Sequence, residues 1–438
     1  MVKTVIVGAG AMGLAAAHYA LKLGHEVDVV EADAVPGGMA AHFDFDGLSI
    51  ERFYHFICKP DAPTFSLLDE LEIAGRLRWR ATSMAYYAEG RLHKWGDPVS
   101  LLTTSLLGPV EKLRYGLQMF LTSRRDDFED LETVRARDWI ERGAGRAVYA
   151  KLWRQLMDLK FYQYADDISA AWIATRVRRV GRSRRSLFQE ELGYLEGGSQ
   201  TLVDALCASI ARQGGRLHLA HPVEEIEAAD GRVTAVRTAK ARFEAEAVIC
   251  TAPTPYMPAL VPALPEASKA AYAAIRNIGV ICVVHKLKRR VTPHFWVNII
   301  DPDIEIPGII EFSNLRPTDD AVVYVPYYMP PDHPKWRASD EALVAESFAY
   351  LKRINPELTD DDRITSRVGR LKHAQPVCEP GFAARIPPIR TPIAGLQVAD
   401  TCFYYPEDRG VSEGARLARE MALAIGTAHE PRRAPVYA

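Results

Sequence analysis

The chain opens with apolar residues in two different spacings. Residues 3–7 (KTVIV) form a short, nearly continuous apolar run, which is typical of a buried strand. Residues 12–23 carry small apolar side chains at helical spacing, and residues 25–31 (HEVDVVE) form a second strand-like run that ends in an acid. This order predicts a strand, a helix that lies close to a sheet, and a second strand.

The middle of the chain predicts a helix followed by short strands. Leu202, Leu206 and Ile210 recur at helical spacing, and the glycine pair at 214–215 marks the end of that helix. Three strand-like runs follow, and ADGR at 229–232 has the composition of a hairpin turn between neighbouring runs. We expect a small antiparallel meander from these runs, which cover residues 217–219, 233–238 and 243–250.

A third pattern lies near the C-terminus. A strand-like run ends at Asp400, and a helical pattern begins near Gly410 after a short loop. The apolar face of this helix is formed by Ala415, Leu417, Ala418, Met421 and Ala422.

Two long stretches separate these three patterns. Residues 57–190 show helix starts, stops and apolar spacing, so we expect them to be mostly helical. Residues 266–384 contain runs rich in β-branched residues at 278–287 and 321–329, which predict an antiparallel sheet.

Length, charge and cysteines limit the classes of function. At 438 residues with 48% hydrophobic content, the chain predicts two domains or one domain with large insertions. The balance of 54 Lys and Arg against 56 Asp and Glu gives no reason to expect nucleic acid. The six cysteines form no CxxC pair or zinc-type cluster, so we expect reduced cysteines and no metal. The N-terminus lacks a signal pattern and no window reaches about 18 apolar residues, so a cytoplasmic protein is expected, with peripheral membrane contact left open.

The first turn carries a glycine pattern that suits a dinucleotide. Gly8 is expected to make a tight turn, Gly10 to let the main chain approach a pyrophosphate, and Gly13 to allow close packing of the helix. Glu31 ends the second strand, where an acid can accept both ribose hydroxyls of an adenosine. A visiting nicotinamide and a resident flavin both fit these residues.

A second glycine pair separates the two cofactors. Gly37 and Gly38 follow Glu31 by six and seven residues, where a long, permanently held dinucleotide needs residues without a Cβ. Together with Glu31 they resemble the extended fingerprint of the FAD-dependent amine oxidase superfamily, which includes protoporphyrinogen oxidases, phytoene desaturases and, more distantly, UDP-galactopyranose mutases. The resemblance favours FAD.

The resemblance implies further flavin-binding segments. Val223, of the pair Val223 and Ile226, matches the valine that meets the adenine, and Gly197 and Gly198 match the glycines that open the preceding helix. Asp400 matches the aspartate that contacts the ribityl and pyrophosphate groups. The complete implied set is Gly8, Gly10, Ala11, Met12, Gly13, Glu31, Ala32, Gly37, Gly38, Met39, Val223, Thr251, Ala252, Pro253, Asp400, Gly410, Val411 and Ser412.

The same resemblance implies a fold class and a division of the chain. The fold is α/β, with a Rossmann-like FAD-binding domain (a parallel sheet plus a small antiparallel meander) and a discontinuous α+β substrate domain. The expected FAD-binding domain covers residues 1–56, 191–265 and 385–430. The expected substrate domain covers residues 57–190 and 266–384, and residues 431–438 form a tail.

Candidate substrate-site residues lie near the first and last segments. Tyr54 and His55 resemble an aromatic-His pair of UDP-galactopyranose mutases, although such a histidine is more often a buried structural residue than a catalytic one. Tyr404 and Tyr405 follow Asp400, which is expected to set them near the reactive face of a flavin. The run at 176–185 holds six arginines; its glycine and serine suggest a loop that is either simply solvated or binds an anion or an anionic membrane.

These observations predict an FAD-dependent oxidoreductase that transfers a hydride from a small organic substrate, anionic or apolar, to flavin N5. The flavin would be reoxidised by oxygen or another acceptor. Cys378 and Cys402 lack an attachment motif, so non-covalent FAD is expected. Two alternatives stay open: a non-redox mutase of the UDP-galactopyranose type, and a non-catalytic escort protein of the same fold.

Overall fold

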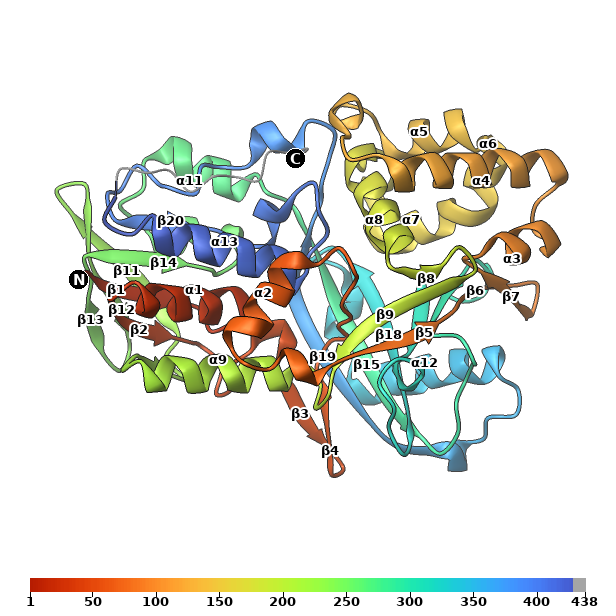
Figure 1. Cartoon of the computed structure of the whole chain (residues 1–438), viewed down its shortest axis with the longest axis horizontal. Coiled ribbons are helices and arrows are strands. Elements are labelled where there is room, and N and C mark those ends of the chain that lie inside the picture. The colour runs from red at the N-terminus through yellow and green to blue at the C-terminus, as the bar shows by residue number, and fades with distance from the viewer. Residues whose placement is uncertain (428–438) are drawn as a thin grey trace.

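The computed structural model describes residues 1–427, and the predicted tail at 431–438 lies outside the described residues together with positions 428–430 of the predicted FAD-binding domain. Figure 1 shows two halves side by side: one holds the N-terminal strand and its flanking helices, and the other holds a larger sheet with a group of helices above it. The predicted α/β fold class is confirmed.

A five-stranded parallel sheet unites the three predicted segments. Its order is β10-β2-β1-β14-β20, and every neighbouring pair is parallel. The N-terminal segment supplies β1 and β2, the middle segment supplies β10 and β14, and the C-terminal segment supplies β20. Their bounds are Lys3–Val7, Glu26–Val30, Arg216–His218, Ala247–Cys250 and Leu396–Val398 for β1, β2, β10, β14 and β20.

The predicted meander is only partly correct. A three-stranded antiparallel sheet does form, but it consists of β11 (Val223–Ala229), β12 (Arg232–Thr238) and β13 (Arg242–Glu244). The run at 217–219 instead pairs with β2, and the run at 243–250 breaks near Glu246, whose amide bonds to the Lys3 carbonyl oxygen (2.8 Å). Tertiary pairing with the N-terminal strands decides this division.

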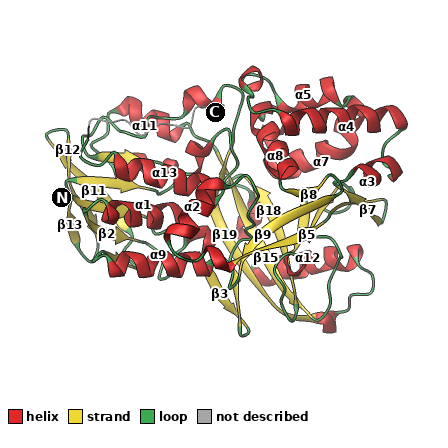
Figure 2. Cartoon of the chain, viewed as in Figure 1, coloured by secondary structure: helices red, strands yellow, loops and turns green. Residues whose placement is uncertain are grey.

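Helices cover the parallel sheet (Figure 2). The central one is α1 (Ala11–Lys22), whose Ala15, Ala16, Ala17 and Ala20 are fully buried, as the small side chains predicted for a helix close to a sheet. It contacts α9 (Gln200–Arg212) and α13 (Val411–Leu423). Further helices in this half are α2 (Ala62–Glu70), α10 (Met257–Leu260) and α11 (Glu266–Ala273).

The second half is built on a seven-stranded sheet of order β19-β15-β18-β17-β16-β6-β7. Neighbours are antiparallel except β6 and β16, which run parallel, so the antiparallel sheet predicted for residues 266–384 forms and gains two strands from earlier in the chain. Bounds are Met84–Ala88, Arg91–Trp95, Asn277–Leu287, Trp296–Ile299, Gly308–Glu311, Ala321–Met329 and Arg363–Pro376 for β6, β7, β15, β16, β17, β18 and β19. Helix α12 (Asp340–Ile354) packs on it.

A helical group and two small sheets complete the structure. The helices are α3 (Pro98–Thr103), α4 (Pro109–Arg124), α5 (Ala136–Gly143), α6 (Arg146–Val148), α7 (Arg154–Phe161) and α8 (Ala170–Arg182). The small sheets pair β3 (His42–Phe45) with β4 (Leu48–Glu51), and β5 (Leu77–Thr82) with β9 (Gln189–Leu195) and β8 (Arg184–Ser186). Strand β9 spans the boundary predicted between residues 190 and 191. The division of the chain into two domains remains a prediction.

The loop predicted for the arginine run is wrong for most of its length. Residues 176–182 continue α8 instead of forming a loop. Arg176, Arg178 and Arg179 form ion pairs with Asp408, Glu407 and Asp61, respectively. Pairing neutralises most of the repulsion that a run of like charges imposes on a helix, and the helix therefore persists to Arg182.

Candidate functional site

A cavity of about 1270 Å³ lies where the predicted segments meet. From the first segment it is lined by Gly8, Gly10, Ala11, Met12, Gly13, Glu31, Ala32, Gly37, Gly38 and Met39. The middle segment contributes Val223, Thr251, Ala252 and Pro253, and the last contributes Asp400, Gly410 and Val411. The structure therefore brings these predicted residues to one wall, and it leaves Ser412 buried outside the lining.

The first glycine turn is closed by a threonine from the middle segment. Gly8 has φ +99°, and a Cβ there would lie 2.5 Å from Thr251 Oγ1. The Thr251 hydroxyl and amide both donate to the Val7 carbonyl oxygen, at 2.9 and 2.8 Å. At Gly13 a Cβ would lie 2.0 Å from the Gly8 carbonyl oxygen, so only glycine permits this contact between helix and turn.

Gly10 differs from these two glycines because no atom lies within 4 Å of an added Cβ. It is the N-cap of α1 and offers no side-chain cap, so the first amides of the helix face the cavity without a capping side chain. Open space beside a bare helix N-terminus suits a pyrophosphate.

Glu31 is held rigidly at the end of β2. Its Oε2 accepts a hydrogen bond from the Ala9 amide (2.6 Å), and its Oε1 accepts one from the Asp33 amide (2.7 Å). Each carboxylate oxygen keeps a further lone pair that can accept from a ribose hydroxyl. The side chain is thus oriented before any ligand arrives.

The second glycine pair also packs against the first turn. The Gly37 amide donates to the Ala9 carbonyl oxygen (2.7 Å), and a Cβ on Gly38 would lie 3.1 Å from the Gly10 Cα. Gly37 has φ +113°. The pair is therefore required by the chain's own packing as well as by any approach to a ligand.

Asp400 ties the last segment to the middle one. Its Oδ1 accepts from the Cys402 amide (2.8 Å), and its Oδ2 accepts from the Thr254 amide (2.6 Å). The carboxylate is buried yet borders the cavity. Beyond it, α13 begins at Val411 with Gly410 as its N-cap, and both residues line the cavity, as the predicted helix start requires.

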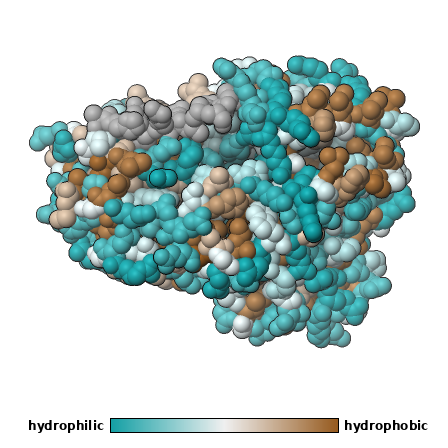
Figure 3. All heavy atoms as spheres, viewed as in Figure 1, coloured by the Kyte–Doolittle hydropathy of each residue, from teal (hydrophilic) through white to brown (hydrophobic). Residues whose placement is uncertain are grey.

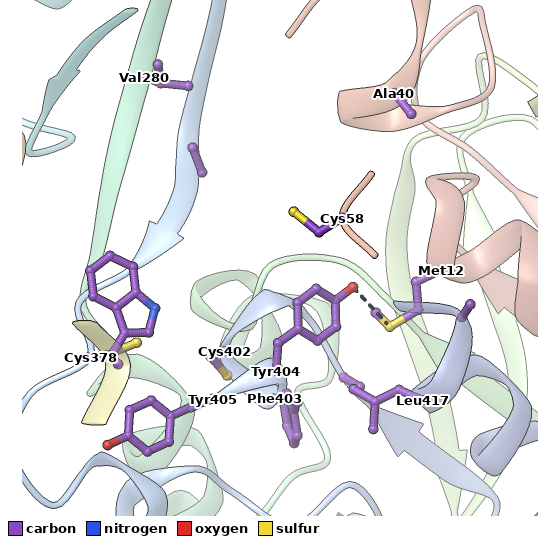
Figure 4. Close-up of a cluster of buried hydrophobic side chains, with 14 of the residues drawn as sticks. Met12, Ala40, Cys58, Val280, Cys378, Cys402, Phe403, Tyr404, Tyr405 and Leu417 are labelled. Atoms are coloured by element: carbon purple, nitrogen blue, oxygen red, sulfur yellow. Dashed lines mark hydrogen bonds between the residues drawn. The ribbon is translucent and has the colours of Figure 1, made fainter. Parts of the chain in front are cut away.

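The adjacent tyrosines Tyr404 and Tyr405 point in different directions (Figure 4). Tyr404 lines the cavity and its hydroxyl lies 3.7 Å from Met12 Sδ. Tyr405 lies outside the lining: its hydroxyl donates to Glu132 (2.5 Å) and shares a hydrogen bond with Ser169 (2.8 Å). The expectation that Tyr405 faces the flavin is therefore corrected, because its hydroxyl is already hydrogen-bonded to Glu132 and Ser169, away from the cavity.

Tyr54 and His55 line the same cavity. The Tyr54 hydroxyl lies 3.4 Å from the hydroxyl of Tyr328 on β18. Burial lowers the pKa of His55 below its ordinary value, so its ring is neutral at neutral pH.

A group of cations lies on the cavity wall, and the sequence indicated only Arg176 among them, as part of the arginine run. Lys160 and Arg409 lie over the Tyr328 ring, at 4.9 and 5.7 Å from its centroid, and Arg176 lies over Trp172. Within residues 1–427 no acceptor lies at hydrogen-bond distance from Lys160 Nζ, and burial, with Arg176 adding to it, lowers the pKa of Lys160 well below its ordinary value. In the sequence only the arginine run indicated positive charge at this part of the cavity, because Lys160 is an isolated basic residue within an ordinary helical pattern.

Asp408 balances part of this charge. Its Oδ2 lies 2.8 Å from Arg176 Nη1. Burial opposes ionisation of this carboxyl, but Arg176, Lys160 and Arg409 outweigh burial and lower its pKa. Arg179 also lies near Asp408 but is paired with Asp61, so Arg176, Lys160 and Arg409 share this one carboxylate, and an anion would complete the group.

The geometry fits FAD. Gly10 leaves open space at a helix N-terminus, Glu31 offers oriented acceptors, and a second helix, α13, begins at the same cavity. Bound FAD would be held by the cavity residues of the three segments, and it would supply a two-electron acceptor. Cys378 and Cys402 are buried and do not line the cavity, which agrees with the predicted non-covalent attachment.

Family comparison agrees with the site. The family described as flavin containing amine oxidoreductase matches residues 13–401, which is most of the chain. The chain belongs to this family. The predicted superfamily, the FAD cofactor and, at the level of the family, the predicted enzyme class of FAD-dependent oxidoreductase are thereby confirmed.

Curated relatives with similar sequences include carotenoid desaturases. The 15-cis-phytoene desaturase of Synechococcus elongatus is 24% identical over 56% of this chain and 56% of its own length. The chain spans about half the length of most of these relatives. The zeta-carotene desaturase of Synechocystis sp. is also 24% identical and is matched over 97% of both chains.

Solved structures share the fold. A protein assigned as a protoporphyrinogen oxidase from Exiguobacterium sp. 255-15 superposes with a TM-score of 0.74 at 20% identity, covering 96% of this chain and 98% of that one. Reduced UDP-galactopyranose mutase gives 0.72 at 14% identity, covering 96% and 95%. At such identities the likeness concerns the fold alone, so the mutase alternative gains no support from it, and the family match does not favour the escort alternative.

Proposed function

We propose that this chain oxidises a small organic substrate by passing a hydride to FAD. The observation that carries the proposal is the convergence of three distant segments, residues 8–13, 251–253 and 400–411, on one cavity. Close main-chain approach, an oriented acid and two helix N-termini are the features that a bound dinucleotide requires. The proposed cofactor-binding residues are those predicted from the sequence, without Ser412.

The residues around the remaining cavity wall have assignable roles. When a hydride leaves a carbon with its electron pair, the attached N–H or O–H releases a proton. His55 is neutral at neutral pH and lines the cavity, so we assign its ring nitrogen as the acceptor of that proton. Tyr54 and Tyr404 would position the substrate. The N-terminus of α13 would stabilise negative charge on the reduced cofactor.

We further propose that the substrate carries an anionic group. Lys160 has no acceptor partner within residues 1–427, and it shares the Tyr328 ring with Arg409. An ammonium removed from bulk water gains most from an anion, and a planar carboxylate also suits the aromatic walls around it. This favours an organic acid over a purely apolar substrate.

Two measurements test the redox proposal. The purified protein should bind FAD tightly enough to remain yellow through gel filtration, and an oxidisable substrate added without oxygen should bleach the visible flavin absorbance. A protein that stays colourless after FAD is supplied would overturn the proposal. A substrate that is isomerised while the spectrum stays intact would also overturn it.

The substrate class is tested with benzoate and benzamide, which differ mainly in charge. Benzoate should perturb the flavin spectrum, whereas benzamide should bind at least about tenfold more weakly, which equals about 1.4 kcal/mol. Lys160→Met should remove this preference while the protein keeps FAD. Lys352→Met is the matched control because Lys352 lies outside the cavity lining and is paired with Asp360 (2.9 Å). Equal binding of both probes would exclude the anion subsite.

A further inference from the structure

Helices α3 and α4 expose a row of large apolar side chains. We call this surface the α3–α4 patch (Figure 3, brown atoms over α3 and α4). Leu113 is 72% exposed and Val110 70%, values at which a leucine or valine gains almost nothing from the fold. The patch consists of Val99, Leu102, Val110, Leu113, Leu117, Phe120 and Leu121.

Helix α4 is turned with its apolar side outward. Its buried residues are polar: Gln118 donates from Nε2 to the Trp139 carbonyl oxygen (3.0 Å), and Thr122 is also buried. A helix of a water-exposed surface normally has the opposite arrangement. Tyr115 and Met119 of α4 also pack against the core. The exposed leucines therefore lie on a different side of the helix from the residues that hold it in place.

Basic residues outnumber acidic ones on the two helices of the patch, whereas the loop that follows carries the acids Asp126, Asp127, Glu129 and Asp130, of which Asp130 pairs with Arg125. Between Pro98 and Arg125 the chain has four basic residues, Lys112, Arg114, Arg124 and Arg125, and a single acid, Glu111. Glu111 accepts from the Gly108 amide (2.7 Å) and pairs with Lys151 (2.8 Å), so it is already used within the fold. Arg124 lies over the Phe120 ring at 5.1 Å, beside the apolar row.

We propose that the α3–α4 patch docks on the surface of an anionic lipid bilayer. Helix α4 would lie in the interface plane, with its apolar row among the acyl chains and its basic side chains at the headgroups. The row from Val110 to Leu121 spans about 18 Å at 1.5 Å per residue, which suits a helix that lies along the surface. Within residues 1–427 no helix is long and apolar enough to cross a bilayer, so the contact is peripheral.

Charge favours lipid over a second copy of this chain. A symmetric pair of patches would bring Lys112, Arg114 and Arg124 of one copy close to the same three residues of the other. Like charges brought together in a desolvating interface repel, whereas each basic side chain near an anionic surface contributes about 1 kcal/mol of attraction.

Vesicle flotation tests the proposal. The holoprotein should float with vesicles of phosphatidylcholine and phosphatidylserine, float much less with phosphatidylcholine alone, and dissociate as salt rises. The double variant Leu113→Ser, Leu117→Ser should lose at least tenfold in vesicle affinity. Leu423→Ser is the matched control, because Leu423 is 51% exposed but ends α13 in the other half of the molecule.

Retention of FAD and an unchanged melting temperature show that the double variant is folded. The proposal is overturned if the wild-type protein ignores both vesicles, or if the double variant floats as well as the wild type. It is also overturned if sedimentation shows a wild-type dimer that the double substitution disperses, since the patch is then a contact between copies.

Discussion

The carboxylate of Asp400 accepts the main-chain amide of Thr254 at 2.6 Å, across 146 positions of sequence. This hydrogen bond joins the last predicted cofactor segment to the turn that follows Pro253. The aspartate predicted to contact a ligand is therefore also a structural anchor. Both of its oxygens are engaged by amides, the second by Cys402.

Replacement of Asp400 should separate its two roles. Asp400→Ala leaves two buried amides without acceptors, which predicts a loss of about 2–4 kcal/mol in unfolding free energy. Asp400→Asn keeps one acceptor oxygen and should lose less. Denaturant unfolding of the FAD-free protein measures the difference. Equal stability of both variants and the wild type would show that the anchor contributes nothing.

Two neighbouring glycines predict opposite outcomes. Gly13→Ala forces a Cβ to 2.0 Å from the Gly8 carbonyl oxygen, so it should destabilise the FAD-free protein by about 1–3 kcal/mol. Gly10→Ala meets no protein atom within 4 Å and should leave the FAD-free protein stable while weakening FAD binding at least tenfold. Melting temperature and FAD titration distinguish the two variants. Tight FAD binding by Gly10→Ala would contradict the assigned pyrophosphate site.

The two adjacent tyrosines should respond differently to loss of the hydroxyl. Tyr405→Phe removes a buried hydrogen bond to Glu132 and should reduce stability by about 1–2 kcal/mol with little change in the flavin spectrum. Tyr404→Phe removes only a weak contact to Met12 and should change the flavin spectrum or substrate KM instead. A spectral change confined to Tyr405→Phe would restore the original expectation for that residue.

Stability should fall as pH rises because of Glu311. Burial raises the pKa of this carboxyl to about 8, although the amide of Val291 donates to it (2.8 Å) and lowers the pKa in part. The ordinary pKa of a glutamate carboxyl is 4.5, so above pH 4.5 the unfolded state has released a proton that the folded state still holds. The free energy of unfolding should decline by up to about 1.4 kcal/mol per pH unit between those two pKa values.

Glu311→Gln removes the titrating group and should flatten that slope. Urea unfolding at several pH values between 5 and 8 measures it for both proteins. Asp303→Asn, on an exposed surface residue, is the control and should keep the wild-type slope. Parallel curves for wild type and Glu311→Gln would contradict the prediction.

The sequence by itself determined the fold class and most of the residues that line the central cavity, and its resemblance to a known family indicated the cofactor. Glycine spacing, the acid after the second strand and the third helix start are local features, set by backbone geometry that only certain residues permit. Such features persist in any tertiary arrangement, and Gly8, Gly13 and Glu31 therefore lie where their spacing predicted.

Only the tertiary structure decided which runs join which sheet and what faces the rest of the cavity. The strand at 216–218 pairs with the free edge of β2 and is therefore not part of the predicted meander. The arginines of α8 form ion pairs with carboxylates from distant segments of the chain. Lys160 and the outward leucines of α4 carry no local signal, since helical spacing reveals an apolar face but not the direction in which packing turns it.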